Sequence, residues 1–285
     1  MKLNLFTRLK NQTLTRDILG KLGFKNTRKI HKILFIKILN LISVKIKTIN
    51  FGSQYGNWDF IHSDNLKNSI FISAGCGEDI SFDIEFLNTY GGRVILVDPT
   101  PRSIQHIKDV IKNLGSKKTL EYYKGGKQSI ETYDLFTITS NQLVLEELAL
   151  YDKSDLTVKF YPPYNEDHVS YSISNIQNVK EDHLNILSVK TVSLKDLMLK
   201  YKIESLNLLK LDIEGAAENN VLPSLLIEKI LPEQILVEFD DLHFKNTISH
   251  IKAVILILKF LFSGYVLIKT NYFHNILLVK KHLIN

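Results

Sequence analysis

Cysteine is nearly absent from this chain of 285 residues, in which Cys76 is the only one. A single cysteine excludes an intramolecular disulfide and any metal site built from a cysteine cluster. The N-terminus also lacks the compact apolar stretch ending in small residues that marks a cleavable secretory signal. We therefore expect a cytoplasmic protein in which Cys76 is a small residue that fills a turn.

A long uninterrupted apolar run is also missing. Residues 253–268 are almost all apolar, but Lys259, Ser263 and Gly264 interrupt them, and a membrane-spanning helix needs about 20 apolar residues. We expect a buried helix that ends at Phe262, followed by a C-terminal β-hairpin. The length and the composition, with 45% hydrophobic and 23% charged residues, suit one large globular α/β domain.

Acidic residues are scarce near the N-terminus. Residues 1–50 contain twelve Lys or Arg and one acid, Asp17, a balance of +11, whereas the remaining residues carry −5. Because the net positive charge comes from this extension, the pI of the whole chain is no argument for a nucleic-acid enzyme. We expect no nucleic-acid partner. The apolar repeat in residues 28–44 predicts a basic amphipathic helix. Residues 28–47 either contact an anionic membrane surface or pack on the neighbouring domain.

One compact unit, residues 69–98, stands out from the rest of the chain. A short apolar strand is followed by Gly75 and Gly77, then by an apolar helical repeat and a second apolar strand that ends at Asp98. Asp98 lies 21 residues beyond Gly77, about where a βαβ nucleotide site places a carboxylate for ribose hydroxyls. The unit predicts a site for a ligand that contains a ribose.

The glycine turn favours one kind of cofactor. A dinucleotide-binding turn has a third glycine at the position that Ile80 occupies here. Glu78 and Asp79 instead put two carboxylates at a helix N-terminus, which suits the helix dipole but repels a pyrophosphate. S-adenosylmethionine has no phosphate and carries a sulfonium and an amine, so this turn favours it over the nicotinamide cofactors. The expected cofactor-binding residues are Ser73, Gly75, Cys76, Gly77, Glu78, Asp79, Asp98 and Pro99.

Strands and helices alternate along the rest of the chain, which predicts an α/β fold with a mostly parallel sheet and helices on both faces. Further strands are expected at residues 120–123, 206–212 and 235–239. Ligands bind beyond the carboxyl ends of the strands in such sheets. Gly75, Asp98, Asp212 and Glu238 all lie at or just after expected strand ends, so we expect them to line one site.

Five blocks of the sequence, taken in order, resemble the FkbM family of S-adenosylmethionine-dependent methyltransferases. They are SAGCGEDISFD from Ser73, VDPTPRSI from Val97, FYPPYNEDHVSYSI from Phe160, LLKLDIEGAAENNVL from Leu208 and ILVEFD from Ile235. The resemblance implies a class I methyltransferase fold, which is Rossmann-like, with a seven-stranded sheet whose last two strands form an antiparallel hairpin. It also implies methyl transfer, typically to a hydroxyl oxygen of a sugar or another metabolite, so the expected partner is a small-molecule or glycan acceptor.

The sequence departs from many methyltransferases at Ser73, where they have an acid that holds the amine of the donor. Glu78 or Asp79 is expected to replace that contact. Since the resemblance begins near residue 68, we divide the chain into a basic helical extension, residues 1–65, and a methyltransferase domain, residues 66–285.

No residue is an unambiguous general base. Asp212 and Glu214, two residues apart after a strand, are the first candidates, although Glu214 is equally suited to cap the next helix. His168, on a polar loop, is either the second candidate or a surface histidine. A nicotinamide-dependent oxidoreductase, disfavoured by Ile80, and a catalytically silent binding or scaffold module stay open as alternatives.

A divalent cation is a further expectation that the acidic residues leave open. Glu238, Asp240 and His243 are placed in the sequence to join Asp212 around an ion, and their oxygen-rich set suits magnesium.

Overall fold

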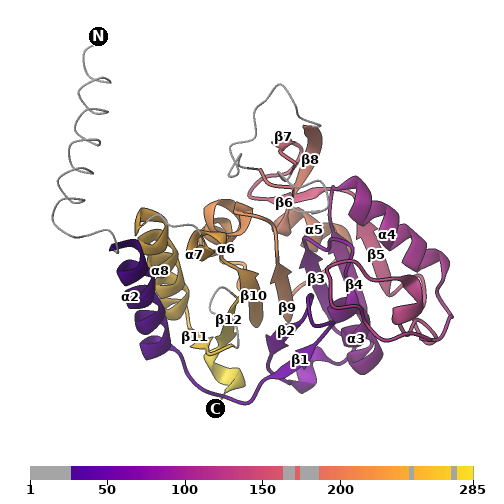
Figure 1. Cartoon of the computed structure of the whole chain (residues 1–285), viewed down its shortest axis with the longest axis horizontal. Helices are drawn as coiled ribbons and strands as arrows, with labels where there is room; N and C mark the ends of the chain where they lie inside the picture. Colours follow the sequence, from indigo (N-terminus) through magenta and orange to yellow (C-terminus); the bar gives the residue numbers. More distant parts are fainter. Residues whose placement is uncertain (1–26, 163–170, 174–185, 244–246, 271–274, 285) are drawn as a thin grey trace, which may run out of the picture.

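The computed structural model describes residues 27–162, 171–173, 186–243, 247–270 and 275–284. Seven strands form its central sheet: β3 (Ile70–Ala74), β4 (Arg93–Val97), β5 (Leu143–Glu146), β9 (Leu208–Leu211), β10 (Gln234–Glu238), β11 (Tyr265–Ile268) and β12 (Asn275–Lys280). Their order is β11-β12-β10-β9-β3-β4-β5 (Figure 1). Strands β10, β9, β3, β4 and β5 are mutually parallel, and β12 is antiparallel to both β10 and β11. The predicted sheet and its C-terminal hairpin are confirmed.

Side chains alternate between the two faces of the sheet, so that Phe71 and Ile72 belong to different cores. One face packs against α2 (Thr27–Ile42), α5 (Leu194–Tyr201), α6 (Leu222–Glu228) and α8 (Thr247–Phe262). The other packs against α3 (Ser81–Tyr90), α4 (Pro101–Lys112) and the antiparallel pair β1 (Ile49–Phe51) and β2 (Trp58–Phe60). Three short helices complete this layer: η2 (Asp64–Leu66), η3 (Ile130–Thr132) and η6 (Lys281–Leu283). The π-helix η5 (Ala217–Val221) and α7 (Asp240–His243) pack on the first face. Helices cover both faces, as expected.

A small second sheet lies beyond the carboxyl ends of the main strands (Figure 1). It consists of β6 (Ala149–Tyr151), β8 (Leu187–Ser193) and β7 (Thr157–Phe160), with β8 in the middle. Strand β8 is parallel to β6 and antiparallel to β7. This sheet stands where ligands bind in open α/β sheets, and it therefore covers the site.

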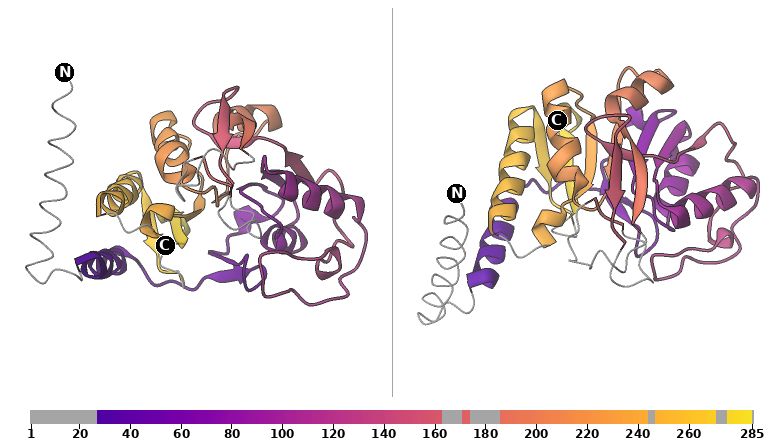
Figure 2. Two further views of the ribbon diagram at one scale, coloured as in Figure 1. Left: turned by 45° about the horizontal axis from the view of Figure 1, so that its top comes forward. Right: turned by 90° about the horizontal axis from the view of Figure 1, so that it is seen from above.

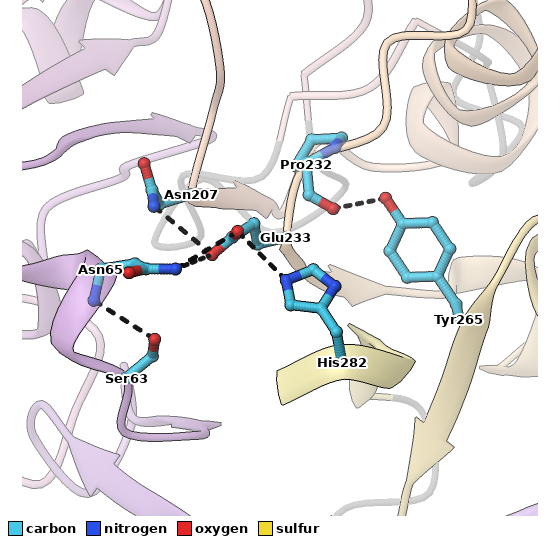
Figure 3. Close-up of polar contacts among 7 residues, drawn as sticks. All are labelled: Ser63, Asn65, Asn207, Pro232, Glu233, Tyr265 and His282. Carbon is cyan, nitrogen blue, oxygen red and sulfur yellow. Dashed lines mark hydrogen bonds and ion pairs between the residues drawn. The ribbon is translucent and has the colours of Figure 1, made fainter. Parts of the chain in front are cut away.

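Polar side chains close the opposite, amino end of the sheet (Figure 3). The Glu233 carboxylate accepts hydrogen bonds of 3.4 Å from the side-chain amides of Asn65 and Asn207. His282 Nε2 lies 3.3 Å from the same carboxylate. Glu233 thus ties η2, the start of β9 and the C-terminal helix η6 together at the end that faces away from the site.

Segments from the two ends of the chain meet beside β11. Helix α2 lies along α8 (Figures 1 and 2), with the rings of Phe35 and His250 edge to face at 5.0 Å. Val44 then forms a β-bridge with Ile268. Strands β1 and β2 follow, and both lie within residues 1–65, the range expected to form the extension. Phe60 of β2 is fully buried and packs in the core beneath the sheet.

Two local expectations are wrong. Residues 120–123 form no strand, because the amides of Thr119 and Leu120 both donate to the carbonyl of Glu131 and the side chain of Leu120 stays exposed. The strand paired beside β4 is β5 instead. Helix α8 is buried on one side only, since Phe260 is fully buried but Phe262 is 89% exposed. Among the described residues no helix is long and apolar enough to cross a membrane.

We expect Gly92→Ala to lower the free energy of unfolding by about 3 kcal/mol or more. Gly92 has φ +77°, and a Cβ there would meet the carbonyl oxygen of Ser69 at 2.1 Å. Gly115 also has a positive φ, +91°, but a Cβ there meets nothing within 4 Å. The control Gly115→Ala therefore carries the backbone strain alone, about 1 kcal/mol. Chemical denaturation measures both, and equal losses would contradict the close contact at Gly92.

Candidate active site

A cavity of about 470 Å³ lies over the carboxyl ends of β3, β4, β9 and β10. The glycine turn after β3, Asp98 after β4, Asp212 after β9 and Glu238 at the end of β10 all line it. The structure therefore brings together the residues that the sequence analysis assigned to one site. The turn between β1 and β2 and the small sheet, through Phe160, form the other walls.

Asp98 holds the glycine turn. Its Oδ2 accepts the amide hydrogens of Cys76, at 2.8 Å, and of Gly77, at 3.1 Å. Its Oδ1 accepts the amide and the hydroxyl of Thr100, at 2.9 and 2.7 Å. A buried carboxylate with four donors is well satisfied, so Asp98 organises the cavity edge in addition to lining it beside Pro99.

The turn also makes a close backbone contact with the end of β9. Gly75 has φ +76°, and a Cβ at this position would lie 1.7 Å from the carbonyl oxygen of Asp212. Only glycine fits such an approach. Gly75 also lines the cavity, so the ligand contact expected of it stays a prediction, while its backbone contact places Asp212 next to the turn.

The amides at the start of α3 are occupied as well. The Ile80 amide donates to the Tyr133 hydroxyl at 3.2 Å, and the Ser81 amide donates to Asp79 Oδ1 at 3.0 Å. In a dinucleotide fold the corresponding donors hold a pyrophosphate. Together with the two amides that Asp98 holds, these donors are satisfied by the chain itself.

Glu78 and Asp79 line the cavity but have partners in the protein. Arg102 and Lys127 both form ion pairs with Glu78, whose side chain is 8% exposed. Asp79 Oδ2 accepts the hydroxyl of Ser53, at 2.5 Å. Ser53 belongs to the turn between β1 and β2, so Asp79 fastens that turn over the site.

The expected role of Ser73 changes in the structure, because Ser73 is fully buried beneath the cavity and does not line it. It pairs in register with Lys210 of β9. The Lys210 ammonium does reach the cavity, donates to the Gly75 carbonyl at 3.3 Å and lies 5.5 Å from the Trp58 ring. Burial alone would lower the pKa of Lys210, but the charges of Asp83 and Asp212 outweigh it and raise that pKa.

Asp83, from the first turn of α3, supplies the counter-charge to this buried lysine. Burial raises the pKa of Asp83, while Lys210 acts in the opposite direction. Burial, with the charges of Asp83 and Asp98, raises the pKa of Cys76 well above its usual range. Cys76 therefore stays a neutral thiol, which agrees with its expected part as a filler of the turn.

Carboxyl groups gather on the other side of the cavity. Burial, and next the charge of Asp212, raise the pKa of Glu238 to about 9, and the two side chains are hydrogen-bonded. Glu238 is then protonated at neutral pH and donates to Asp212. Burial, followed by the charge of Glu214, likewise raises the pKa of Asp240 to about 9. Asp212 thus accepts a hydrogen bond from Glu238 at the cavity wall.

The expected cation ligands do not converge. Within the described ranges no group of three or more His, Cys, Asp or Glu is arranged to hold a metal ion. Asp240 instead accepts the amide of Gly215 and does not line the cavity. Its role is to hold the turn that carries Glu214, whose φ of +43° is unusual for a residue other than glycine. The side chain of His243 lies outside the part that the structure describes.

His168 lies outside the described residues, so its place stays a prediction. The lining also includes Lys210 and Tyr55, which the sequence did not indicate, and Trp58, which the sequence leaves open between covering a cofactor pocket and simple packing. Lys210 interrupts the apolar run of β9, and a lysine at such a position is the feature of the sequence that could have indicated its place in the site. Tyr55 sits in a polar, glycine-rich turn, where no pattern distinguishes it. Burial, with the charges of Asp212 and Glu238, raises the pKa of Tyr55.

An open parallel sheet that ends in an antiparallel pair, with a polar cavity at its carboxyl edge, is the arrangement of a class I methyltransferase. The model of one family, described as the methyltransferase FkbM domain, matches residues 74–267. This match covers more than half of the chain, and the chain belongs to the FkbM methyltransferase family. No curated protein and no solved structure matches it.

The free energy of unfolding is expected to fall as the pH rises from about 5 to about 9, by roughly 1.4 kcal/mol per pH unit at most for each buried acid. Glu238 keeps its proton in the folded state up to about pH 9, whereas the unfolded chain loses it near pH 4.5. Deprotonation therefore favours the unfolded chain across this window.

Glu238→Gln removes this proton and should make the decline with pH shallower, as chemical denaturation at several pH values would measure. Glu121→Gln is the matched control, because the Glu121 side chain is 93% exposed. If the free energy of unfolding declines with pH at the same slope in the parent chain and in both variants, the raised pKa of Glu238 is refuted.

Proposed function

We propose that this methyltransferase uses S-adenosylmethionine and methylates a hydroxyl oxygen on a sugar, glycan or related metabolite. One observation carries the choice of donor. The glycine turn has its amides bonded to the chain's own acceptors, and it presents acidic groups to the cavity. A cationic sulfonium and amine suit such a wall, whereas the pyrophosphate of a nicotinamide cofactor meets negative charge and occupied donors.

The acidic wall also supports a hydroxyl acceptor. Asp212, Glu214 and Glu238 line the cavity. Carboxyl oxygens accept hydrogen bonds, and the proton that Glu238 keeps is already donated to Asp212. A ligand rich in hydroxyl donors satisfies such a wall. Tyr55 and Trp58 supply aromatic surface beside it. These contacts support a polyhydroxylated small molecule as the acceptor.

When bound, S-adenosylmethionine supplies an electrophilic methyl group on sulfur. Holding the acceptor oxygen in line with that carbon supplies roughly 7–11 kcal/mol of barrier reduction. In our proposal Asp212 accepts the hydroxyl proton, which adds about 10²–10⁴-fold in rate. Lys210 and Gly75 keep Asp212 in place from the floor of the cavity, the first through its charge and the second through backbone contact.

Calorimetry with S-adenosylhomocysteine tests the donor. We expect one molecule to bind per chain, and Asp98→Asn to weaken binding about tenfold or more, since an amide nitrogen replaces one acceptor oxygen among four donors. Asp109 of α4, whose side chain is 42% exposed, offers the matched control Asp109→Asn. Absence of binding at high micromolar ligand overturns the proposal, and NADH binding in its place favours the oxidoreductase.

Turnover with labelled donor, screened over sugar-nucleotide, glycan and lipid-linked acceptors, tests the catalytic role. Asp212→Asn should lower kcat by about 10²–10⁴-fold and leave the affinity for S-adenosylhomocysteine unchanged. His168→Ala is the comparison that separates the two candidate bases. Full turnover in Asp212→Asn with loss in His168→Ala would move the base to the polar loop. Donor binding without turnover on any acceptor class supports the silent module.

A further inference from the structure

Acidic residues are confined to the middle of the chain. Apart from Asp17, all of them lie between residues 59 and 241. Residues 18–58 contain eight Lys or Arg and no acid, and residues 242–285 contain six Lys and no acid. The two acid-free segments are far apart in the sequence, so the sequence alone does not show that their charges add.

The fold places the two acid-free segments together. Helix α2 comes from the first and α8 from the second, and they lie side by side at one side of the molecule (Figures 1 and 2). The bridge between Val44 and Ile268 continues this contact. Lys37 and Lys45 of the first segment are exposed. Helices α2 and α8 therefore bring basic residues and no acid of their own to this side of the protein.

Helix α8 exposes a stripe of four apolar residues and two lysines on this side. Its exposed residues recur at the spacing of one helix face. We call them the α8 stripe: Ile248, Ile251, Lys252, Ile255, Lys259 and Phe262. The four apolar members are between 46% and 89% exposed, and Leu41 of the neighbouring α2 is 85% exposed. An exposed apolar stripe of this kind marks an interaction surface.

We propose that the α8 stripe docks on an anionic lipid surface, with the lysines of α2 and α8 at the phosphate level. A helix that lies in the membrane interface has apolar side chains toward the acyl chains and basic side chains toward the head groups. The stripe has both kinds on one face. α8 is too short to cross a membrane, so it lies along the surface.

Charge decides between a lipid surface and a second copy of this chain. A symmetric dimer through the α8 stripe would bring Lys252 and Lys259 of each copy against a second acid-free helix, and like charges repel. An anionic lipid surface neutralises the same lysines. The lipid surface is therefore the occupant that the charges support.

Vesicle co-sedimentation of the full chain tests the docking. Two preparations are used, phosphatidylcholine alone and phosphatidylcholine with an equal part of phosphatidylglycerol. The parent chain should bind the second preparation and lose binding as salt is added, because salt screens the lysines. Ile251→Glu/Ile255→Glu should weaken that binding about tenfold or more. Both residues are exposed, so the variant keeps its fold, as circular dichroism checks.

The matched control is Leu120→Glu/Leu199→Glu, which puts the same two charges on exposed leucines outside α2 and α8. Unchanged binding in the control with loss in the stripe variant supports the proposal. Three results overturn it: no binding of the parent chain, equal binding of the parent chain and the stripe variant, or equal loss in the two variants. Light scattering that shows a dimer dissociated by the stripe variant, without vesicle binding, assigns the stripe to a second copy.

Discussion

The buried carboxylate of Asp98 connects the parts of the site. Four donors from the glycine turn and from the start of α4 converge on its two oxygens. Because burial removes competing water, these bonds determine how β3 and β4 end. The turn held in this way then meets the backbone of Asp212 at a distance that only Gly75 permits. The position of the expected base thus depends on a carboxylate from another strand.

Most of the buried charges at the site lie close to a group that compensates them. Lys210 and Asp83 form a buried opposite pair under the cavity, and each counters the cost of burying the other. Asp212 and Glu238 share a proton, which lets two acids occupy one wall. Glu78 is neutralised by Arg102 and Lys127 from outside. At the two ends of the fold, residues 18–58 and 242–285 carry basic residues and no acid.

Much of the fold could be predicted because its signals are local. Buried strands such as β4 and β10 contain continuous apolar runs, VILV and ILV, and glycines such as Gly91 mark the helix ends. Residues 120–123 show the limit: a short apolar run is equally compatible with a strand or an exposed loop, and partners distant in sequence decide. The same limit applies to Tyr55, which lines the cavity from the turn that the hydrogen bond between Ser53 and Asp79 holds.

The sequence by itself determined the class of the protein, since a glycine turn, a distal acid and alternating elements are properties of neighbouring residues. It also determined that Ile80 replaces a third glycine. Tertiary structure alone decided that Tyr133 satisfies the Ile80 amide, that Asp83 balances Lys210, and that two acid-free segments form one face. The physical reason is that hydrogen bonds and charges act over a few ångströms in space, and the chain brings these groups together only when it folds.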